Sequence, residues 1–266
     1  AGGCANYDTV VDNPAFAITV REQPTDLAIE LSAPSKLSVG IELIPLPSDP
    51  RANPARQKPI ATSGNYRPGF CLLEAPSVPP GRYALLAATF EPRQEGPFAL
   101  QLGSSHALAA VGRLPHEGHG LQRQVYRSEW SSLAGTAAGC ANHRNYHRNP
   151  QLRLMLSRKG DVLLRLRCQT TPGSSLSDAR PYLAVDVYGP HRDAPLGPME
   201  HETQKLMPLL TSGGGKYGYP PGGALVPRTT LEPGSYVLVL STFDPTSCAF
   251  ELVLYASQGV ATLERL

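Results

Sequence analysis

The feature that most constrains the fold of this chain is a short stretch that occurs twice. Residues 2–6 read Gly-Gly-Cys-Ala-Asn and residues 138–142 read Ala-Gly-Cys-Ala-Asn, and each copy is followed by an Asn-Pro pair, at 13–14 and 149–150. Both the cysteine and the proline recur 136 residues later. Two landmarks that keep their order and spacing indicate a tandem duplication, so we expect two related folding units.

A second pair of matching stretches predicts the architecture of each unit. Residues 78–83 read Val-Pro-Pro-Gly-Arg-Tyr, residues 231–236 read Leu-Glu-Pro-Gly-Ser-Tyr, and a Thr-Phe-acidic-Pro segment follows each. Pro-Gly sets a tight turn, and a tyrosine just beyond it can fold its hydroxyl back to the backbone of the turn, as in the tyrosine corner of Greek-key sandwiches. Two such corners at equivalent places predict an antiparallel β-sandwich for each unit.

The pattern of apolar residues agrees with an all-β chain. Residues 26–31 and 37–44 alternate apolar and polar side chains, which is typical of half-buried strands, and residues 151–157 and 162–168 repeat this in the second unit. The 27 prolines and 25 glycines suit short strands joined by many turns. We therefore predict a first sandwich over residues 1–105, a linker over 106–120 and a second sandwich over 121–266.

The first copy of the repeat begins abruptly. In the second copy, residues 122–130 form a plausible opening strand that ends at Trp130, ten residues before Cys140. The matching tryptophan of the first copy would fall before Ala1. We therefore expect the first sandwich to lack its opening strand, and the chain to be a piece of a longer protein.

Charge and cysteine usage narrow the class of protein. The net charge is only +2, which gives no support for nucleic-acid binding. The five cysteines are odd in number and thinly spread, unlike the dense, even sets of secreted disulfide scaffolds. We expect a reduced intracellular setting with no disulfide framework.

The complete set of motifs resembles the C2-like β-sandwich of calpains, called calpain domain III. That domain opens with a tryptophan before Ala-Gly-Gly-Cys-x-Asn and Asn-Pro, and finishes with Pro-Gly-x-Tyr, Thr-Phe-x-Pro and a closing strand. Two such domains in tandem, with no EF-hand domain after them, look like the atypical calpains, and most of all the PalB-like proteases of fungal ambient-pH signalling and their ESCRT-linked animal relatives. The second copy departs from the pattern with Ala-Gly-Cys in place of Gly-Gly-Cys.

The resemblance implies a fold and a function. The fold would be two tandem antiparallel C2-like β-sandwiches, forming the non-catalytic C-terminal regulatory region of a calpain-like cysteine endopeptidase. They would brace the upstream protease domain and dock it on adaptor or ESCRT-type proteins, in the cytoplasm and peripherally at endosomal membranes. None of the five cysteines has the Gly-Asp-Cys-Trp surroundings of a calpain nucleophile. We expect no catalytic residue, cofactor or metal in this chain.

Histidines and acidic residues give little support for a metal site. His143 and His147 are four apart but lie in a turn-like segment, and His116 and His119 fall one residue short of the zincin spacing. A calcium site needs several converging oxygen ligands, whereas the acidic residues of the loops are scattered. Those in the second unit are Asp178, Asp193, Glu200 and Glu202.

One charged feature is a candidate binding site. Seven basic residues lie between positions 144 and 167, against Asp161 alone. Alternation places Arg165 and Arg167 on one face of their strand and Arg153 on the polar face of the preceding strand. If these two strands pair, the three arginines form an outward basic patch for an anionic lipid headgroup, an acidic protein segment or the protease core. The competing interpretation is an ordinary solvated sheet face.

Three alternative functions fit the sequence less well. A C2-like module that binds membrane phospholipid through the basic patch is the main alternative, with weak contact to an anionic membrane. A carbohydrate-binding sandwich of a secreted enzyme should carry exposed aromatic platforms and disulfides, yet the chain has one tryptophan and an odd cysteine count. A stand-alone enzyme is disfavoured because no catalytic constellation can be assembled.

Overall fold

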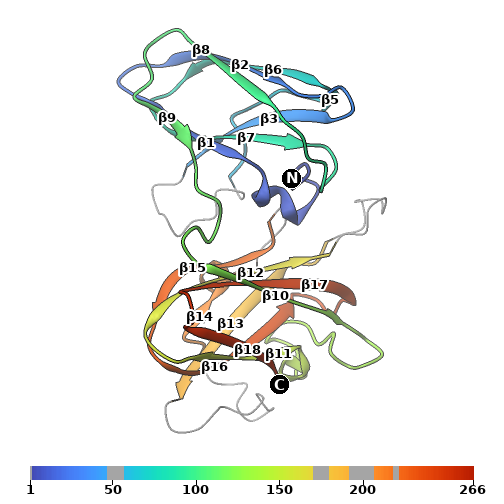
Figure 1. Ribbon diagram of the computed structural model, residues 1–266. Coiled ribbons are helices and arrows are strands. Elements are labelled where there is room, and N and C mark those ends of the chain that lie inside the picture. Colours follow the sequence, from blue (N-terminus) through green and yellow to red (C-terminus); the bar gives the residue numbers. More distant parts are fainter. Residues whose placement is uncertain (1, 47–56, 170–179, 192–206, 218–221) are drawn as a thin grey trace. The chain divides into compact units, whose positions relative to one another are not determined.

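The computed structural model describes residues 2–46, 57–169, 180–191, 207–217 and 222–266 (Figure 1). The chain divides into two compact units, Ala1–Glu117 and Gly118–Leu266. Among the described residues the only helical segments are short 3₁₀ turns, and everything else that is regular is strand. The all-β prediction is confirmed, and the sheets of each unit form the two layers of a sandwich (Figure 1).

The first unit consists of two antiparallel sheets. The larger sheet has the order β4-β3-β7-β1-β9, with β5 also pairing with β3, and the smaller has the order β6-β2-β8. The strands are β1 (Ala15–Val20), β2 (Thr25–Ser32), β3 (Ser38–Pro45), β4 (Ala61–Thr62), β5 (Arg67–Pro68), β6 (Phe70–Val78), β7 (Gly81–Thr89), β8 (Ala99–Ser104) and β9 (Ala110–Arg113).

The second unit repeats this plan with one strand more in its smaller sheet. The larger sheet has the order β14-β13-β16-β11-β18 and the smaller has the order β10-β17-β12-β15. The strands are β10 (Gln122–Trp130), β11 (Gln151–Leu156), β12 (Gly160–Cys168), β13 (Leu183–His191), β14 (Leu210–Thr211), β15 (Ala224–Leu231), β16 (Gly234–Thr242), β17 (Cys248–Ala256) and β18 (Ala261–Arg265).

Apart from β5 and β10, the described strands of the two units correspond one to one, as expected of a tandem duplication. The order β4-β3-β7-β1-β9 matches β14-β13-β16-β11-β18, and β6-β2-β8 matches β15-β12-β17. Within the described residues of the first unit, no strand corresponds to β10. The segment expected as a linker, residues 106–120, contains β9, which pairs with β1, and the division between the units falls inside it.

Each sandwich encloses its own apolar core, built by alternation along the strands. On β2, Leu27, Ile29 and Leu31 are buried and the residues between them are exposed. Because every strand turns one face inward, aliphatic side chains from both sheets interdigitate between the layers. The core of the second unit also contains three large aromatic side chains that are fully buried, those of Trp130, Tyr236 and Phe250.

The repeated Asn-Pro pair has a structural explanation. Asn13 Oδ1 accepts a hydrogen bond from the Gly2 amide at 2.8 Å, and its Nδ2 donates to the carbonyls of Gly3 and Val10. Asn149 makes the same three bonds in the second unit, to Ala138, Gly139 and Tyr146. Each asparagine therefore ties the Gly-Cys stretch to the 3₁₀ turn before the first strand of the larger sheet. These turns are η1 (Asp8–Asp12) and η3 (Tyr146–Arg148).

Both predicted tyrosine corners are present. The Tyr83 hydroxyl donates to the Pro79 carbonyl at 2.8 Å, and the Tyr236 hydroxyl donates to the Glu232 carbonyl at 2.7 Å. Each bond reaches back four residues across the Pro-Gly turn, so it fixes the start of β7 or β16.

One edge strand of each smaller sheet carries a proline inside a bulge. On β6 the pairing with β2 slips between Ala75 and Val78, around Pro76. On β15 the pairing with β12 slips between Val226 and Thr229, around Pro227. Proline cannot donate to a sheet, so edge strands and bulges are where it is tolerated.

Candidate binding sites

The structure separates the three arginines of the predicted basic patch. Arg153 lies on β11, which pairs with β16 and β18, whereas Arg165 and Arg167 lie on β12, which pairs with β15 and β17. The two strands do not pair, so the condition on which the predicted patch depended is not met. Although only three residues separate them, the apolar faces of β11 and β12 line opposite sides of the core, so the chain crosses from one sheet to the other.

Each of these arginines has a partner within the second unit. Arg153 Nη1 lies 3.5 Å from Glu264 Oε2 on the neighbouring strand β18. Arg165 is buried, and its Nη1 donates to the Gly222 carbonyl at 2.6 Å. Arg167 is also buried and donates from Nε and Nη2 to Glu251 Oε1, at 3.0 and 2.7 Å.

Glu251 is the centre of a charge network on the outer face of the smaller sheet. Besides Arg167 on β12, it meets Arg127 on β10, with Nη2 at 2.7 Å from Oε2, and more distantly Arg123 at 3.9 Å. Burial acts to raise the pKa of Glu251, but the hydrogen bonds and charges of Arg167 and then Arg127 outweigh it, and the pKa is lowered. The carboxylate thus neutralises part of the positive charge that the sequence led us to expect on this surface.

The cysteines are placed for packing. Cys4, Cys71 and Cys140 are buried, and burial is the main cause of the raised thiol pKa of Cys4 and Cys71. A nucleophilic cysteine needs a lowered pKa, because the thiolate is the reactive form. Cys168 Sγ lies 3.7 Å from Cys248 Sγ, well beyond the roughly 2.05 Å of a disulfide bond.

No metal centre is found in the part of the chain that the structure describes. No three or more His, Cys, Asp or Glu side chains come together there in a way that could hold an ion. Asp178, Asp193, Glu200 and Glu202, which were weighed as calcium ligands, lie outside the described residues. Within the same described ranges, no helix is long and apolar enough to cross a membrane.

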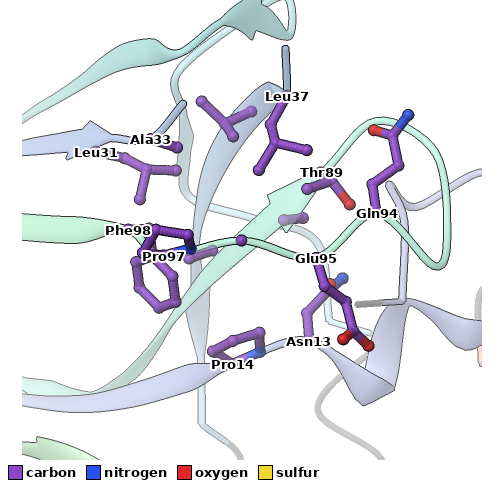
Figure 2. A pocket seen from close by; sticks show the side chains of 14 residues that line it. Asn13, Pro14, Leu31, Ala33, Leu37, Thr89, Gln94, Glu95, Pro97 and Phe98 are labelled. Atoms are coloured by element: carbon purple, nitrogen blue, oxygen red, sulfur yellow. The ribbon is translucent and has the colours of Figure 1, made fainter. Parts of the chain in front are cut away.

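Sequence reasoning did not anticipate a cavity of about 150 Å³ in the first unit. Apolar side chains, among them Leu31, Leu37 and Phe98, line one part of it, while Asn13, Gln94 and Glu95 form a polar rim (Figure 2). The cavity lies where the segment leading into β8 passes the ends of β1 and β7. Phe98 borders it and leaves 40% of its side chain exposed.

In the second unit the corresponding place is filled by Trp130. Its indole Nε1 donates to the Leu240 carbonyl at 2.8 Å, and its ring centroid lies 4.3 Å from that of Phe250. Leu240 corresponds to Ala87, because each makes the same hydrogen bond in its unit. The Leu240 amide donates to the Pro150 carbonyl at 3.0 Å, and the Ala87 amide donates to the Pro14 carbonyl at 3.1 Å. Phe250 corresponds to Phe98 by the register of β17 and β8. Ala87 and Phe98 both line the cavity, so the missing tryptophan was the signal that could have predicted it.

No family model matches the chain, but curated proteins resemble it. Calpain-7 of Sus scrofa is 41% identical over 107 residues, covering 39% of this chain and 13% of that protein. The calpain-like protease palB/RIM13 of Cryptococcus neoformans is 24% identical over 98% of this chain, and palB of Emericella nidulans is 33% identical over 45% of it.

The aligned region is a minor part of each of these relatives. The chain spans 30% of the Cryptococcus protein and 14% of the Emericella protein. Two observations support the relationship of the chain to these proteins. Both of its units are β-sandwiches that contain the repeated motifs, and the relatives reported above are calpain-7 and palB-type proteases. The chain is a tandem β-sandwich region whose homologues are calpain-7 and the PalB/RIM13 calpain-like proteases, which confirms the predicted resemblance to the PalB-like type.

Proposed function

We propose that the chain is a non-catalytic regulatory and interaction region of a calpain-like cysteine endopeptidase. It would brace the protease core and dock it on adaptor or ESCRT-type proteins, in the cytoplasm and at the surface of endosomes. The observation that carries the proposal is the extent of the match. Nearly the whole chain aligns with a palB/RIM13 protease, yet it spans only 30% of that protein.

The chemistry of the described residues supports a binding role. The inward faces of both sandwiches are filled by apolar side chains, and the raised pKa of the buried Cys4 and Cys71 thiols opposes thiolate formation. Outward strand faces and loops therefore remain as the surfaces on which the region would act. Docking through such surfaces on a rigid β-scaffold is a common arrangement.

The alternative of a phospholipid-binding module has less support. It relied on one patch made of Arg153, Arg165 and Arg167, but these lie on two sheets and pair within the fold. Each cation near an anionic membrane contributes about 1 kcal/mol, and arginines already neutralised by Glu251 and Glu264 would contribute less.

The test compares the intact protease with a variant that lacks residues 1–266. We expect the deletion to abolish co-purification of partner proteins and to lower cleavage of the natural substrate. The separate 266-residue chain should recover the same partners without hydrolysing peptides. Thiol-dependent hydrolysis by this chain would contradict the proposal, as would a deletion that changes neither partners nor cleavage. Sedimentation with phosphatidylserine vesicles, but with no protein partner, would favour the alternative.

A further inference from the structure

Two cysteines of the second unit have their sulfur atoms in contact. Cys168 Sγ on β12 lies 3.7 Å from Cys248 Sγ on β17, and either thiol can donate a hydrogen bond to the other. The two strands pair antiparallel with Cys168 opposite Phe250, so Cys248 lies two residues further along on the same inward face. The contact therefore joins neighbouring strands of the smaller sheet through residues that are distant in the sequence.

The pair lies where the two strands end. Cys168 is the last residue of β12, and Cys248 is the first residue of β17. A disulfide bond is about 2.05 Å long, so the two sulfur atoms have to approach each other by about 1.7 Å to form one. Residues at a strand end are held by fewer ladder hydrogen bonds than residues in the middle of a sheet, and this makes such a shift easier.

The two thiols differ in their access to solvent. Cys168 is buried, whereas Cys248 is only partly buried. A small oxidant therefore reaches Cys248 first, and Cys168 lies against it as the second thiol. An accessible cysteine next to a second, resolving cysteine is a common arrangement of redox-sensitive sites.

Packing of the sandwich does not require sulfur at either position. In the first unit Ala33 takes the place of Cys168, because the register of β2 and β8 places it opposite Phe98. Gly96 takes the place of Cys248, two residues before Phe98. The first unit forms the same sheet with side chains that carry no thiol, so the paired thiols are an addition to the shared scaffold.

We propose that Cys168 and Cys248 form a reversible disulfide when the protein meets hydrogen peroxide. The Cys248 thiolate attacks one oxygen of the peroxide, so that an S–O bond forms, the O–O bond breaks, and hydroxide leaves and takes up the proton that the Cys248 thiol released. The Cys168 sulfur then attacks the sulfur of the Cys248 sulfenic acid. The S–S bond forms, the S–O bond breaks, and the oxygen leaves as water with the proton of Cys168. The two thiols lose two electrons in total, and the peroxide is reduced to two molecules of water.

The disulfide changes how the end of the smaller sheet is held. Cys248 pairs with Trp130, the last residue of β10, so the ends of three adjacent strands meet at this point. In the reduced state, hydrogen bonds and packing hold these ends together. In the oxidised state β12 and β17 are also joined covalently, and the crosslink restricts the unfolded chain. The second unit thereby acquires a stability that depends on the redox state.

Peptide mapping of the oxidised chain tests the proposal. The folded 266-residue chain is treated with a small excess of hydrogen peroxide, its remaining thiols are blocked, and its peptides are identified by mass spectrometry. We expect one linked pair of peptides, which contain Cys168 and Cys248, and the loss of two of the five thiols, which dithiothreitol should restore. Hydrogen exchange of the β12 and β17 amides should become about tenfold slower on oxidation. The reaction needs only this chain, so its failure would leave the proposed function unaffected.

Matched substitutions show whether this pair is responsible. Cys168→Ala copies the first unit, and Cys248→Ser removes the more accessible thiol, so neither variant should form the link or show slower exchange. Cys140→Ala is the control, because it removes a buried thiol of the repeated stretch and keeps the pair, and it should oxidise like the wild type. An unchanged thiol count would overturn the proposal, as would a link between two chains or oxidation of Cys248 to a sulfinic acid while Cys168 keeps its thiol.

Discussion

The two units have the same strand order but make different use of their outward faces. On β2 of the first unit, Glu30 and Ser32 are exposed on the outer face of the smaller sheet. At the corresponding positions of β12, Arg165 and Arg167 are buried and hydrogen-bonded. The comparison shows that the alternation of apolar residues on the inward strand faces determines the sandwich fold. The outer face of the smaller sheet can either be exposed to solvent or carry a buried network of charged side chains.

A second contrast lies on the outer face of the larger sheets. In the first unit Val10, Ile44 and Leu86 form a small apolar cluster there. In the second unit Tyr146 and Tyr188 stand in place of Val10 and Ile44, and the Tyr146 hydroxyl donates to Asp186 Oδ2. Burial, followed by the charge of Asp186, raises the pKa of Tyr146. A 3₁₀ turn can thus be held to the sheet by aliphatic packing or by a buried hydrogen bond.

The largest effect is expected from Trp130→Ala, which would make the second unit resemble the first. The substitution leaves a cavity against Phe250 and removes the donor to Leu240, so it should destabilise the second unit by about 3–5 kcal/mol. Hydrogen exchange on β17 measures the loss. Trp130→Phe keeps an aromatic ring, so it should destabilise the second unit less than Trp130→Ala. An equal loss of stability would show that packing of the ring is not the main contribution of Trp130.

Glu251→Gln tests the charge network on the smaller sheet of the second unit. Arg167 would remain buried without its carboxylate, and we expect a loss of about 3 kcal/mol at pH 7. The fluorescence of Trp130, the single tryptophan, reports unfolding of this unit.

The same carboxylate gives the second unit a dependence on pH. Because the pKa of Glu251 is lower in the folded than in the unfolded state, its contribution is complete above the ordinary glutamate pKa and disappears as the pH falls through the folded value. Between neutral and acidic pH, the wild type should therefore lose more stability than Glu251→Gln. Parallel pH profiles would contradict the assignment.

Asn13→Ala and Asn149→Ala test what the units share. Each removes three hydrogen bonds and leaves backbone groups buried without partners, so each should cost its own unit about 2 kcal/mol. Hydrogen exchange on β1 and β11 measures the two losses separately. If only one of the two substitutions destabilised its unit, the asparagine of the repeated motif would not have the same structural role in both units.

The smallest effects are expected from Tyr83→Phe and Tyr236→Phe. Each removes one hydroxyl bond of a tyrosine corner and keeps the ring, so we expect about 1 kcal/mol in each unit. Hydrogen exchange on β7 and β16, measured at increasing denaturant concentration, compares the losses of stability in the two units. A much larger loss at one corner would indicate that its Pro-Gly turn depends more strongly on the tyrosine.

Much of the fold was predictable because it rests on local signals. The tyrosine corners, the Asn-Pro pairs and the alternation on β2 each specify a turn or a face within a few residues. Whether β11 pairs with β12 could not be decided from the sequence, because a three-residue connection suits both a hairpin and a crossing between sheets. The partners of Arg165 and Arg167 depend on which strand lies alongside, and alternation within one strand does not supply that information. The cavity beside Phe98 likewise arises from an interaction that is remote in sequence.

The prolines in the bulges of β6 and β15 bear on how such a β-rich protein remains dispersed in solution. A regular, unprotected edge strand is a template for other polypeptides and a starting point for fibrous aggregates. Pro76 and Pro227 lack a backbone N–H, and the bulges around them bend the backbone away from a regular ladder. The duplication thus retained a safeguard against aggregation in both copies, at the edge of each smaller sheet opposite β8 or β10.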